Sequence, residues 1–277
     1  MKELTLKEIQ DFSLDILKDV HRFCEKENIR YTLAYGTLIG AIRHHGFIPW
    51  DNDIDICMPR SDYERFIRTY KSEKYEIAFF GEGCKFDCLI AYARVFDNKK
   101  TIAKNAHWIA EPAGVWIDIF PLDGVPDNFD DFKTLYSNLH DEWEKIIPKK
   151  IQFKRVTHCA GIKNKLKLFL KKLRKRNGLG GHRMQKEYNE KIAQIPFESA
   201  NFWSQLSVMD NGPVEHFPVN TFNERILLDF EDSQFYALKD YDTVLQAVYG
   251  DYMQLPPESD REPHQSFIKF YWKKDKV

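Results

Sequence analysis

Three aspartates occupy alternate positions in a segment that is otherwise rich in apolar residues. Asp51, Asp53 and Asp55 lie in the stretch FIPWDNDIDICMP. In a β-strand, residues i and i+2 point to the same face, so Asp53 and Asp55 should project together while Ile54 and Ile56 pack behind them. Neighbouring carboxylates repel each other and are costly to bury without compensation. Mg²⁺ or Mn²⁺, held by carboxylates together with phosphate oxygens, would supply that compensation.

A Gly-Thr turn precedes the aspartates and a further aspartate follows them. Gly36 and Thr37 lie where a strand is predicted to end and a helix to begin, and free N–H groups at such a point suit a phosphate. Asp118, within VWIDIFPL, is flanked by apolar residues and is the best candidate for a third metal-binding acid. The alternative is that Asp53 and Asp55 are solvent-exposed acids at a strand edge, where they discourage aggregation.

The elements that must position these residues alternate along the first half of the chain. Apolar alternation predicts strands, and helical periodicity with capping signals predicts helices. Ser61 is expected to cap the helix that follows the aspartates. The predicted strands are 29–36, 52–58, 75–81, 89–97 and 114–126, and the predicted helices are 4–28, 37–45 and 61–72.

Helical patterns dominate after residue 126, and the composition changes near residue 145. Helices are predicted at 129–147, 163–176, 181–194 and 241–250, with a strand at 225–230. We therefore expect an α/β (α+β) protein with a catalytic core over 1–145 and a mainly helical part over 146–277 that completes the site.

Composition limits the class of protein. The chain has 277 residues, 43% of them hydrophobic and 14% aromatic, which is typical of a folded globular protein. Its N-terminus resembles an amphipathic helix rather than a signal peptide, and the five cysteines form no dense framework, so a reduced cytoplasmic protein is expected. Cys84 and Cys88 lack the second pair that a structural zinc site needs.

A strongly basic segment covers residues 145–186. It holds 15 of the 41 Lys and Arg residues and none of the 42 acidic ones. Its predicted helix 163–176 has an apolar stripe at helical spacing, formed by Leu166, Phe169, Leu170 and Leu173. Such a helix can lie on the anionic inner face of a membrane, although it can equally pack its leucines on the fold. Nucleic acid is not an expected partner, because the rest of the chain is acidic.

Three blocks, in order, resemble the LicD family of phosphocholine transferases, which includes relatives of fukutin. They are AYGTLIGAIRHHGFIPWDNDIDICMP, GVWIDIFPLDGVP and VYGDYMQLPPESDREPH. The resemblance spans about residues 28–265 and implies a nucleotidyltransferase-type fold, a small mixed sheet flanked by helices. It implies that Gly36 and Thr37 form the phosphate turn and that Asp53, Asp55 and Asp118 hold the metal. Family members often have Asp where this chain has Asn52.

The resemblance also implies a reaction. Phosphocholine would pass from CDP-choline, or a similar CDP-alcohol, to a sugar hydroxyl of a cell-surface glycan or its lipid-linked precursor, and CMP would leave. Asp118 or Asp51 is the expected base for the attacking hydroxyl. Arg43, Arg94 and His264 are further candidates to contact the donor, with ordinary structural roles as the alternative.

Choline has no hydrogen-bonding group on its quaternary nitrogen and is usually held by aromatic faces. The candidates in the family-like blocks are Trp50, Trp116, Tyr249 and Tyr252.

Other functions stay open from the sequence. The transferred group could be phosphoethanolamine or a polyol phosphate, or the protein could be a nucleotidyltransferase acting on a small molecule. A binding module without activity is the remaining alternative, and the intact set of clustered carboxylates argues against it.

Overall fold

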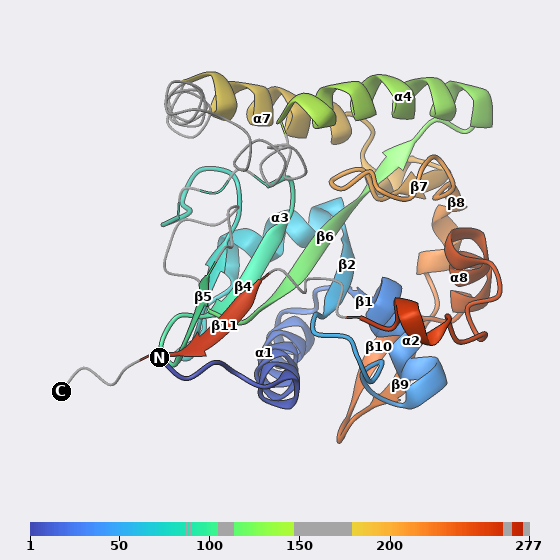
Figure 1. Ribbon diagram of the computed structural model, residues 1–277. Helices are drawn as coiled ribbons and strands as arrows, with labels where there is room; N and C mark the ends of the chain where they lie inside the picture. Colours follow the sequence, from blue (N-terminus) through green and yellow to red (C-terminus); the bar gives the residue numbers. More distant parts are fainter. Residues whose placement is uncertain (87, 89, 105–113, 147–178, 263–267, 274–277) are drawn as a thin grey trace, which may run out of the picture.

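A mixed β-sheet lies at the centre of the computed structural model, which describes residues 1–86, 88, 90–104, 114–146, 179–262 and 268–273 (Figure 1). Five strands follow the order β1-β2-β6-β4-β3, and β7 and β8 extend the sheet from the end of β6. The strands β2 and β6 are parallel, whereas β4 is antiparallel to both β6 and β3. Their bounds are β1 Thr32–Leu33, β2 Asp55–Pro59, β3 Tyr75–Ala78, β4 Ala93–Asp97, β6 Trp116–Val125, β7 Phe202–Ser204 and β8 Phe217–Pro218.

Two small antiparallel sheets complete the β-structure. One pairs β9 (Arg225–Phe230) with β10 (Ser233–Leu238), and the other pairs β5 (Thr101–Lys104) with β11 (Lys269–Trp272). The predicted mixed α/β class is confirmed, and the strand predicted at 225–230 is β9. The sequence did not predict β5, β7, β8, β10 and β11. β5 pairs with β11 and β7 with β6, so the partners of these strands come from distant parts of the chain and local patterns signal them weakly. β10 is the second strand of the hairpin that begins with β9.

The helices agree closely with the predicted ones where the structure describes them. They are α1 Leu6–Glu27, α2 Tyr35–His44, α3 Arg60–Thr69, α4 Phe129–Ile146, α7 Leu179–Ile192 and α8 Tyr241–Tyr249, with short 3₁₀ helices η1 Phe197–Ser199, η2 Val219–Phe222 and η3 Glu258–Asp260. The helix predicted at 163–176 lies outside the described residues. No helix in the described part of the chain is long and apolar enough to cross a membrane.

The predicted cap at Ser61 is wrong. Helix α3 begins at Arg60 with Pro59 at its N-cap, so Ser61 already lies inside the first turn. Its hydroxyl donates to Glu198 instead. Pro59 has no N–H to donate to a strand ladder, so it ends β2, and α3 begins directly after it without a side-chain cap.

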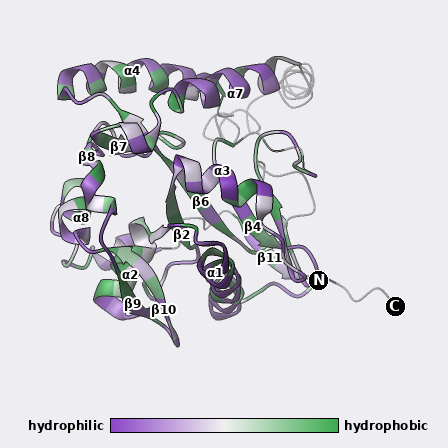
Figure 2. Ribbon diagram, turned by 180° about the vertical axis from the view of Figure 1, so that it is seen from behind, coloured by the Kyte–Doolittle hydropathy of each residue, from purple (hydrophilic) through white to green (hydrophobic). Residues whose placement is uncertain are grey.

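Strand pleating divides the central sheet into two chemically different faces. Ile54, Ile56, Ile117 and Ile119 are fully buried in the core cluster that also contains Leu17 of α1. Asp55 and Asp118 alternate with these isoleucines and therefore point to the opposite face. Figure 2 shows hydrophobic, green residues along β6 and many hydrophilic, purple residues along helices α4 and α7.

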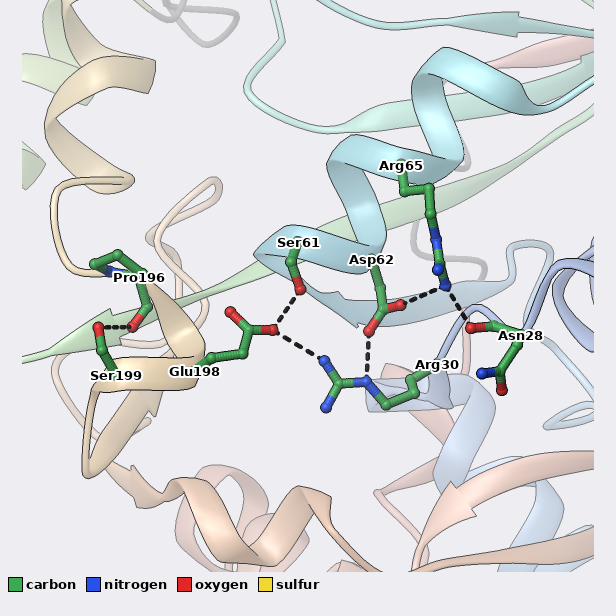
Figure 3. A network of polar contacts seen from close by, with 8 residues as sticks. All are labelled: Asn28, Arg30, Ser61, Asp62, Arg65, Pro196, Glu198 and Ser199. Atoms are coloured by element: carbon green, nitrogen blue, oxygen red, sulfur yellow. Dashed lines mark hydrogen bonds and ion pairs between the residues drawn. The ribbon is translucent and has the colours of Figure 1, made fainter.

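Polar contacts join the C-terminal segment to the N-terminal elements (Figure 3). Arg30 Nε donates to Asp62 Oδ2 at 2.5 Å, and Arg30 Nη2 donates to Glu198 Oε1 at 3.0 Å. Arg65 joins the same network through Asp62 and the backbone carbonyl of Asn28. These contacts fix the start of α3 against the end of α1 and against η1.

Candidate active site

Asp55 and Asp118 meet at the centre of the sheet. They are register partners on the parallel strands β2 and β6, and Arg94 on β4 is the antiparallel partner of Asp118. The Asp118 N–H donates to the Ile54 carbonyl at 2.9 Å, which ties the two acidic segments together. The predicted neighbourhood of Asp118 with the Asp51–Asp55 segment is thus present in the structure.

The carboxylate of Asp55 carries a strong electrostatic penalty. Burial raises its pKa well above the ordinary value, and the charges of Asp53, Asp118 and Asp51 raise it further. Arg94 opposes the shift without reversing it. This is the charge pattern of a site that is stabilised when a cation joins it.

The donor chemistry of Asp53 and Asp55 fits a hard divalent cation such as Mg²⁺ or Mn²⁺. In the part of the chain that the structure describes, no group of three or more His, Cys, Asp or Glu side chains is arranged to hold a metal ion as it stands. Asp118 is directed toward Arg94, so its metal-binding role stays a prediction.

Arg94 and Asp118 form a buried ion pair. Arg94 Nε donates to Asp118 Oδ1 and Arg94 Nη2 to Asp118 Oδ2 at 3.3 Å, with both side chains at most 5% exposed. Burial raises the pKa of Asp118 and Arg94 counters that shift. Arg94 Nη1 is buried and, within the described residues, has no hydrogen-bond partner. This N–H group, beside an acidic site, is suited to donate a hydrogen bond to a phosphate oxygen.

The Gly-Thr turn forms the first turn of α2 and faces the acidic segment. The Thr37 hydroxyl accepts a hydrogen bond from the Asp55 N–H at 2.9 Å, which positions the first residue of β2. A Cβ atom on Gly36 would lie 2.9 Å from Asp51 Oδ2, so glycine permits the close approach of this carboxylate. Gln10 of α1 donates to the Asp51 carbonyl at 2.8 Å and holds the loop from the other side.

Asn52 is 8% exposed, and its side-chain carbonyl has no hydrogen-bond partner among the described residues. Asn52 precedes β2, which begins at Asp55, so strand alternation does not assign its side chain to either face of the sheet.

Arg43 has a structural role in this conformation. Its Nη1 donates to the carbonyls of Tyr252 and Gln254 at 2.7 and 3.3 Å, and its Nε donates to His44. These bonds attach α2 to the segment after α8. His264 lies outside the described residues.

The four aromatic candidates lie in different surroundings. The Arg94 guanidinium covers the ring of Trp116 at 4.4 Å, and Arg261 lies 5.5 Å from the ring centre of Trp50. Tyr252 is buried, and its hydroxyl donates to Asp242 at 2.7 Å. Tyr249 lines a cavity beside the acidic face.

That cavity contains residues which the sequence analysis did not single out. Tyr35, Trp203 and Glu215 line it together with Cys57, which follows Asp55 by two positions on the same strand. Glu215 is separated from Tyr35 by 180 residues, and no local motif marks it. Its only signal in the sequence is an isolated acid between apolar residues in PVEHF.

Comparisons with known proteins agree with this geometry. Residues 28–154 match the model of the LicD/FKTN/FKRP nucleotidyltransferase domain, a range that includes the aspartates, the Gly-Thr turn and Arg94. The chain is 35% identical over 280 residues to the lipopolysaccharide cholinephosphotransferase LicD of Haemophilus influenzae, covering 95% of this chain and 97% of that protein.

Shorter similarities involve two rickettsial proteins described as uncharacterized. The one from Rickettsia typhi is 36% identical over 81 residues, covering 28% of this chain and 26% of that protein. The one from Rickettsia prowazekii is 32% identical over 95 residues, covering 32% and 36%. Because the similarity to the Haemophilus protein extends over almost the whole of both chains, this protein belongs to the LicD family.

Proposed function

We propose that the protein transfers phosphocholine from CDP-choline to a sugar hydroxyl of a cell-surface glycan or its lipid-linked precursor, with release of CMP. The observation that carries the proposal is the similarity over nearly the full length to a lipopolysaccharide cholinephosphotransferase. The pairing of Asp55 with Asp118 beside a Gly-Thr helix start supports the same chemistry.

The donor pyrophosphate binds between the start of α2 and the acidic face. The N–H groups in the first turn of α2 and the spare Nη1 of Arg94 are donors for phosphate oxygens. Asp53 and Asp55 would hold Mg²⁺ or Mn²⁺, and Asp118 would be a third ligand if its carboxylate turned from Arg94. The bound metal would neutralise negative charge on the phosphate oxygens.

The acceptor hydroxyl oxygen attacks the phosphorus of the phosphocholine group. The bond from that phosphorus to the CMP oxygen breaks, and CMP takes the electron pair. Asp51 receives the hydroxyl proton in this proposal, because the Asp118 carboxylate already accepts hydrogen bonds from Arg94 and, at 3.4 Å, from Trp116 Nε1.

Nucleotide release tests the proposal. The purified protein is incubated with Mg²⁺ or Mn²⁺, a panel of CDP-alcohols and nucleoside triphosphates, and cell-envelope glycan extract, and CMP and pyrophosphate are separated by chromatography. We expect CMP from CDP-choline, dependent on metal and lost in Asp53→Ala. Pyrophosphate from a triphosphate, with all CDP-alcohols intact, would show that the protein moves nucleotides instead.

Peripheral attachment to an anionic membrane through residues 145–186 is part of the proposal, because lipid-linked acceptors lie at such a surface. Most of this segment lies outside the described residues, so its basic composition alone supports it. Co-sedimentation with vesicles that contain or lack anionic lipid tests it, and equal, negligible binding to both would exclude it.

A further inference from the structure

A small cavity adjoins the acidic face and is lined by residues of β1, α2, β2 and α8, among others. Figure 1 shows where these elements lie. Its volume is about 30 Å³, enough for one or two water molecules. The lining is mostly aliphatic, with three aromatic side chains (Tyr35, Trp203 and Tyr249) and one carboxylate, that of Glu215. Such a combination of apolar walls and a single negative charge is unusual for a purely structural void.

Glu215 is buried, with 6% of its surface exposed. It accepts hydrogen bonds from the Tyr35 hydroxyl at 3.2 and 3.3 Å and from Asn211 Nδ2 at 2.9 Å. Among the described Lys, Arg and His residues, none contributes to its electrostatic environment. Burial raises the pKa of Glu215 to about 7, although hydrogen bonds from Asn211, Tyr35 and the Gln205 backbone act in the opposite direction.

The cavity lies next to the acidic face, on the same side of the sheet. Asp55 and Cys57 point to the same side of β2 and are separated by about 7 Å along the strand. Cys57 lines the cavity. If the phosphate of a ligand lies beside Asp55, a group that is linked to this phosphate through one oxygen and two carbons would therefore lie near the cavity.

The chemistry of the lining selects among such groups. Aromatic faces and a carboxylate attract a cation, and the aliphatic walls offer no acceptors for N–H groups. A quaternary ammonium fits this environment because it is charged and has no N–H to satisfy. A primary ammonium would lose the water that solvates its three N–H groups and gain few partners in return.

Tyr249 is the one exposed side chain among the lining residues, at 43%. It is the last residue of α8 and is followed by Gly250, whose φ of 66° ends the helix. A trimethylammonium group is larger than the present space, so its entry requires a wall to move. Tyr249 is placed to turn outward and then close over the ligand.

We propose that this cavity is the choline subsite of the donor, with Glu215 as the counter-charge and Tyr249 as the movable aromatic wall. The assignment rests on the proposed phosphocholine transfer and names the residues that choose choline over ethanolamine.

Direct binding tests the subsite. The full chain is titrated with phosphocholine and with phosphoethanolamine at pH 8 in the presence of Mg²⁺, by isothermal calorimetry, for the wild type, Glu215→Gln and Tyr249→Leu. Glu187→Gln, which removes an exposed carboxylate on α7, is the matched control. We expect the wild type and the control to prefer phosphocholine by about tenfold or more, and Glu215→Gln to lose most of that preference.

Tyr249→Leu keeps the test valid if Glu215→Gln fails to fold, because Tyr249 lies at the surface. We expect it to weaken phosphocholine binding severalfold and to leave phosphoethanolamine binding unchanged. A folded Glu215→Gln or Tyr249→Leu protein with the wild-type preference for phosphocholine would overturn the subsite.

Failure of the proposed function gives a different pattern. A wild type that binds phosphocholine in a Glu215-dependent manner but releases no CMP from CDP-choline would refute the transfer reaction and support the subsite. The opposite pattern is that the wild type releases CMP from CDP-choline, while Glu215→Gln and Tyr249→Leu keep the wild-type preference for choline over ethanolamine. This pattern would refute the subsite and support the reaction.

Discussion

Asp55 and Asp118 stand directly opposite each other on two parallel strands, β2 and β6. Arg94, opposite Asp118 on β4, compensates one of the two charges. Burial and the charges of Asp53, Asp118 and Asp51 nevertheless raise the pKa of Asp55. The predictions below depend on this unfavourable environment of the Asp55 charge.

Removing the Asp55 charge should separate activity from stability. Because its pKa is raised in the folded protein, an ionised Asp55 destabilises the fold above the ordinary carboxyl pKa. We expect Asp55→Asn to unfold at the same or a higher temperature at pH 7 while its CMP release falls at least about 100-fold, a loss of about 3 kcal/mol of transition-state stabilisation.

Metal binding gives an independent readout of the same site. A cation at 100 times its dissociation constant should raise the free energy of unfolding by about 2.7 kcal/mol. We expect saturating Mg²⁺ or Mn²⁺ to raise the thermal midpoint of the wild type and not that of Asp55→Asn. Equal shifts in both proteins would show that the metal binds elsewhere.

Two buried Arg–Asp pairs allow a matched comparison. Arg60 Nε and Nη2 donate to Asp123 at 2.6 and 2.7 Å, in a largely buried pair that lies five residues beyond Asp55 and Asp118 in the sequence. Arg60→Met and Arg94→Met should each cost about 3–5 kcal/mol of unfolding free energy, because each leaves a buried carboxylate unpaired. Urea titration measures this cost.

Activity should distinguish the two variants. Per folded molecule, Arg60→Met should keep its CMP release. Arg94→Met should lose its CMP release, because the substitution removes the N–H group that donates a hydrogen bond to the phosphate. Similar losses in both would mean that Arg94 acts only through stability. Arg94→Lys should not restore activity, since lysine cannot reproduce the two-pronged geometry.

Gly36→Ala should disturb the site through a single contact. The new Cβ would lie 2.9 Å from Asp51 Oδ2, and the carboxylate must shift. We expect CMP release to fall about tenfold and the unfolding free energy to change by less than about 1 kcal/mol, since alanine favours a helix. In an Asp51→Ala background the same change should have little further effect on activity, and an additive loss would contradict this explanation.

Choline affinity should depend on pH through Glu215. Ionised Glu215 attracts the cation, and its pKa is about 7, so choline should bind more tightly as the pH rises from 6 to 8. The increase should approach about tenfold, because the ionised fraction grows from roughly a tenth to roughly nine tenths over that range. Choline itself does not titrate there, so calorimetry with choline chloride measures the effect on the protein.

The tyrosine and cysteine side chains that face Glu215 from other elements stay neutral over this range. Burial raises the pKa of Tyr35 on α2, Cys57 on β2 and Tyr249 on α8, and it raises that of Tyr136 on α4 to about 12. The adjacent His216 directs its Nε2 to the Pro126 carbonyl and stacks on Phe202. Glu215→Gln should abolish the pH dependence and Asp55→Asn should preserve it; the reverse result would assign the titration to the acidic cluster.

The sequence by itself determined the local features of this protein. Alternation of aspartates with isoleucines predicted that Ile54 and Ile56 face the core, and both are fully buried even though β2 begins only at Asp55. Helical periodicity predicted α1, α3, α4, α7 and α8 to within a few residues. These properties depend on neighbours in the chain, so a local pattern is sufficient to reveal them.

Only the tertiary structure decided which distant groups meet. The ion pair of Arg94 with Asp118 depends on the register between β4 and β6, and the contact of Tyr35 with Glu215 joins residues 180 positions apart. It also showed that Trp116 lies under Arg94 and that Arg43 binds backbone carbonyls. A periodic pattern specifies a face but not the partner that covers it, because strand register and packing are set by the whole fold.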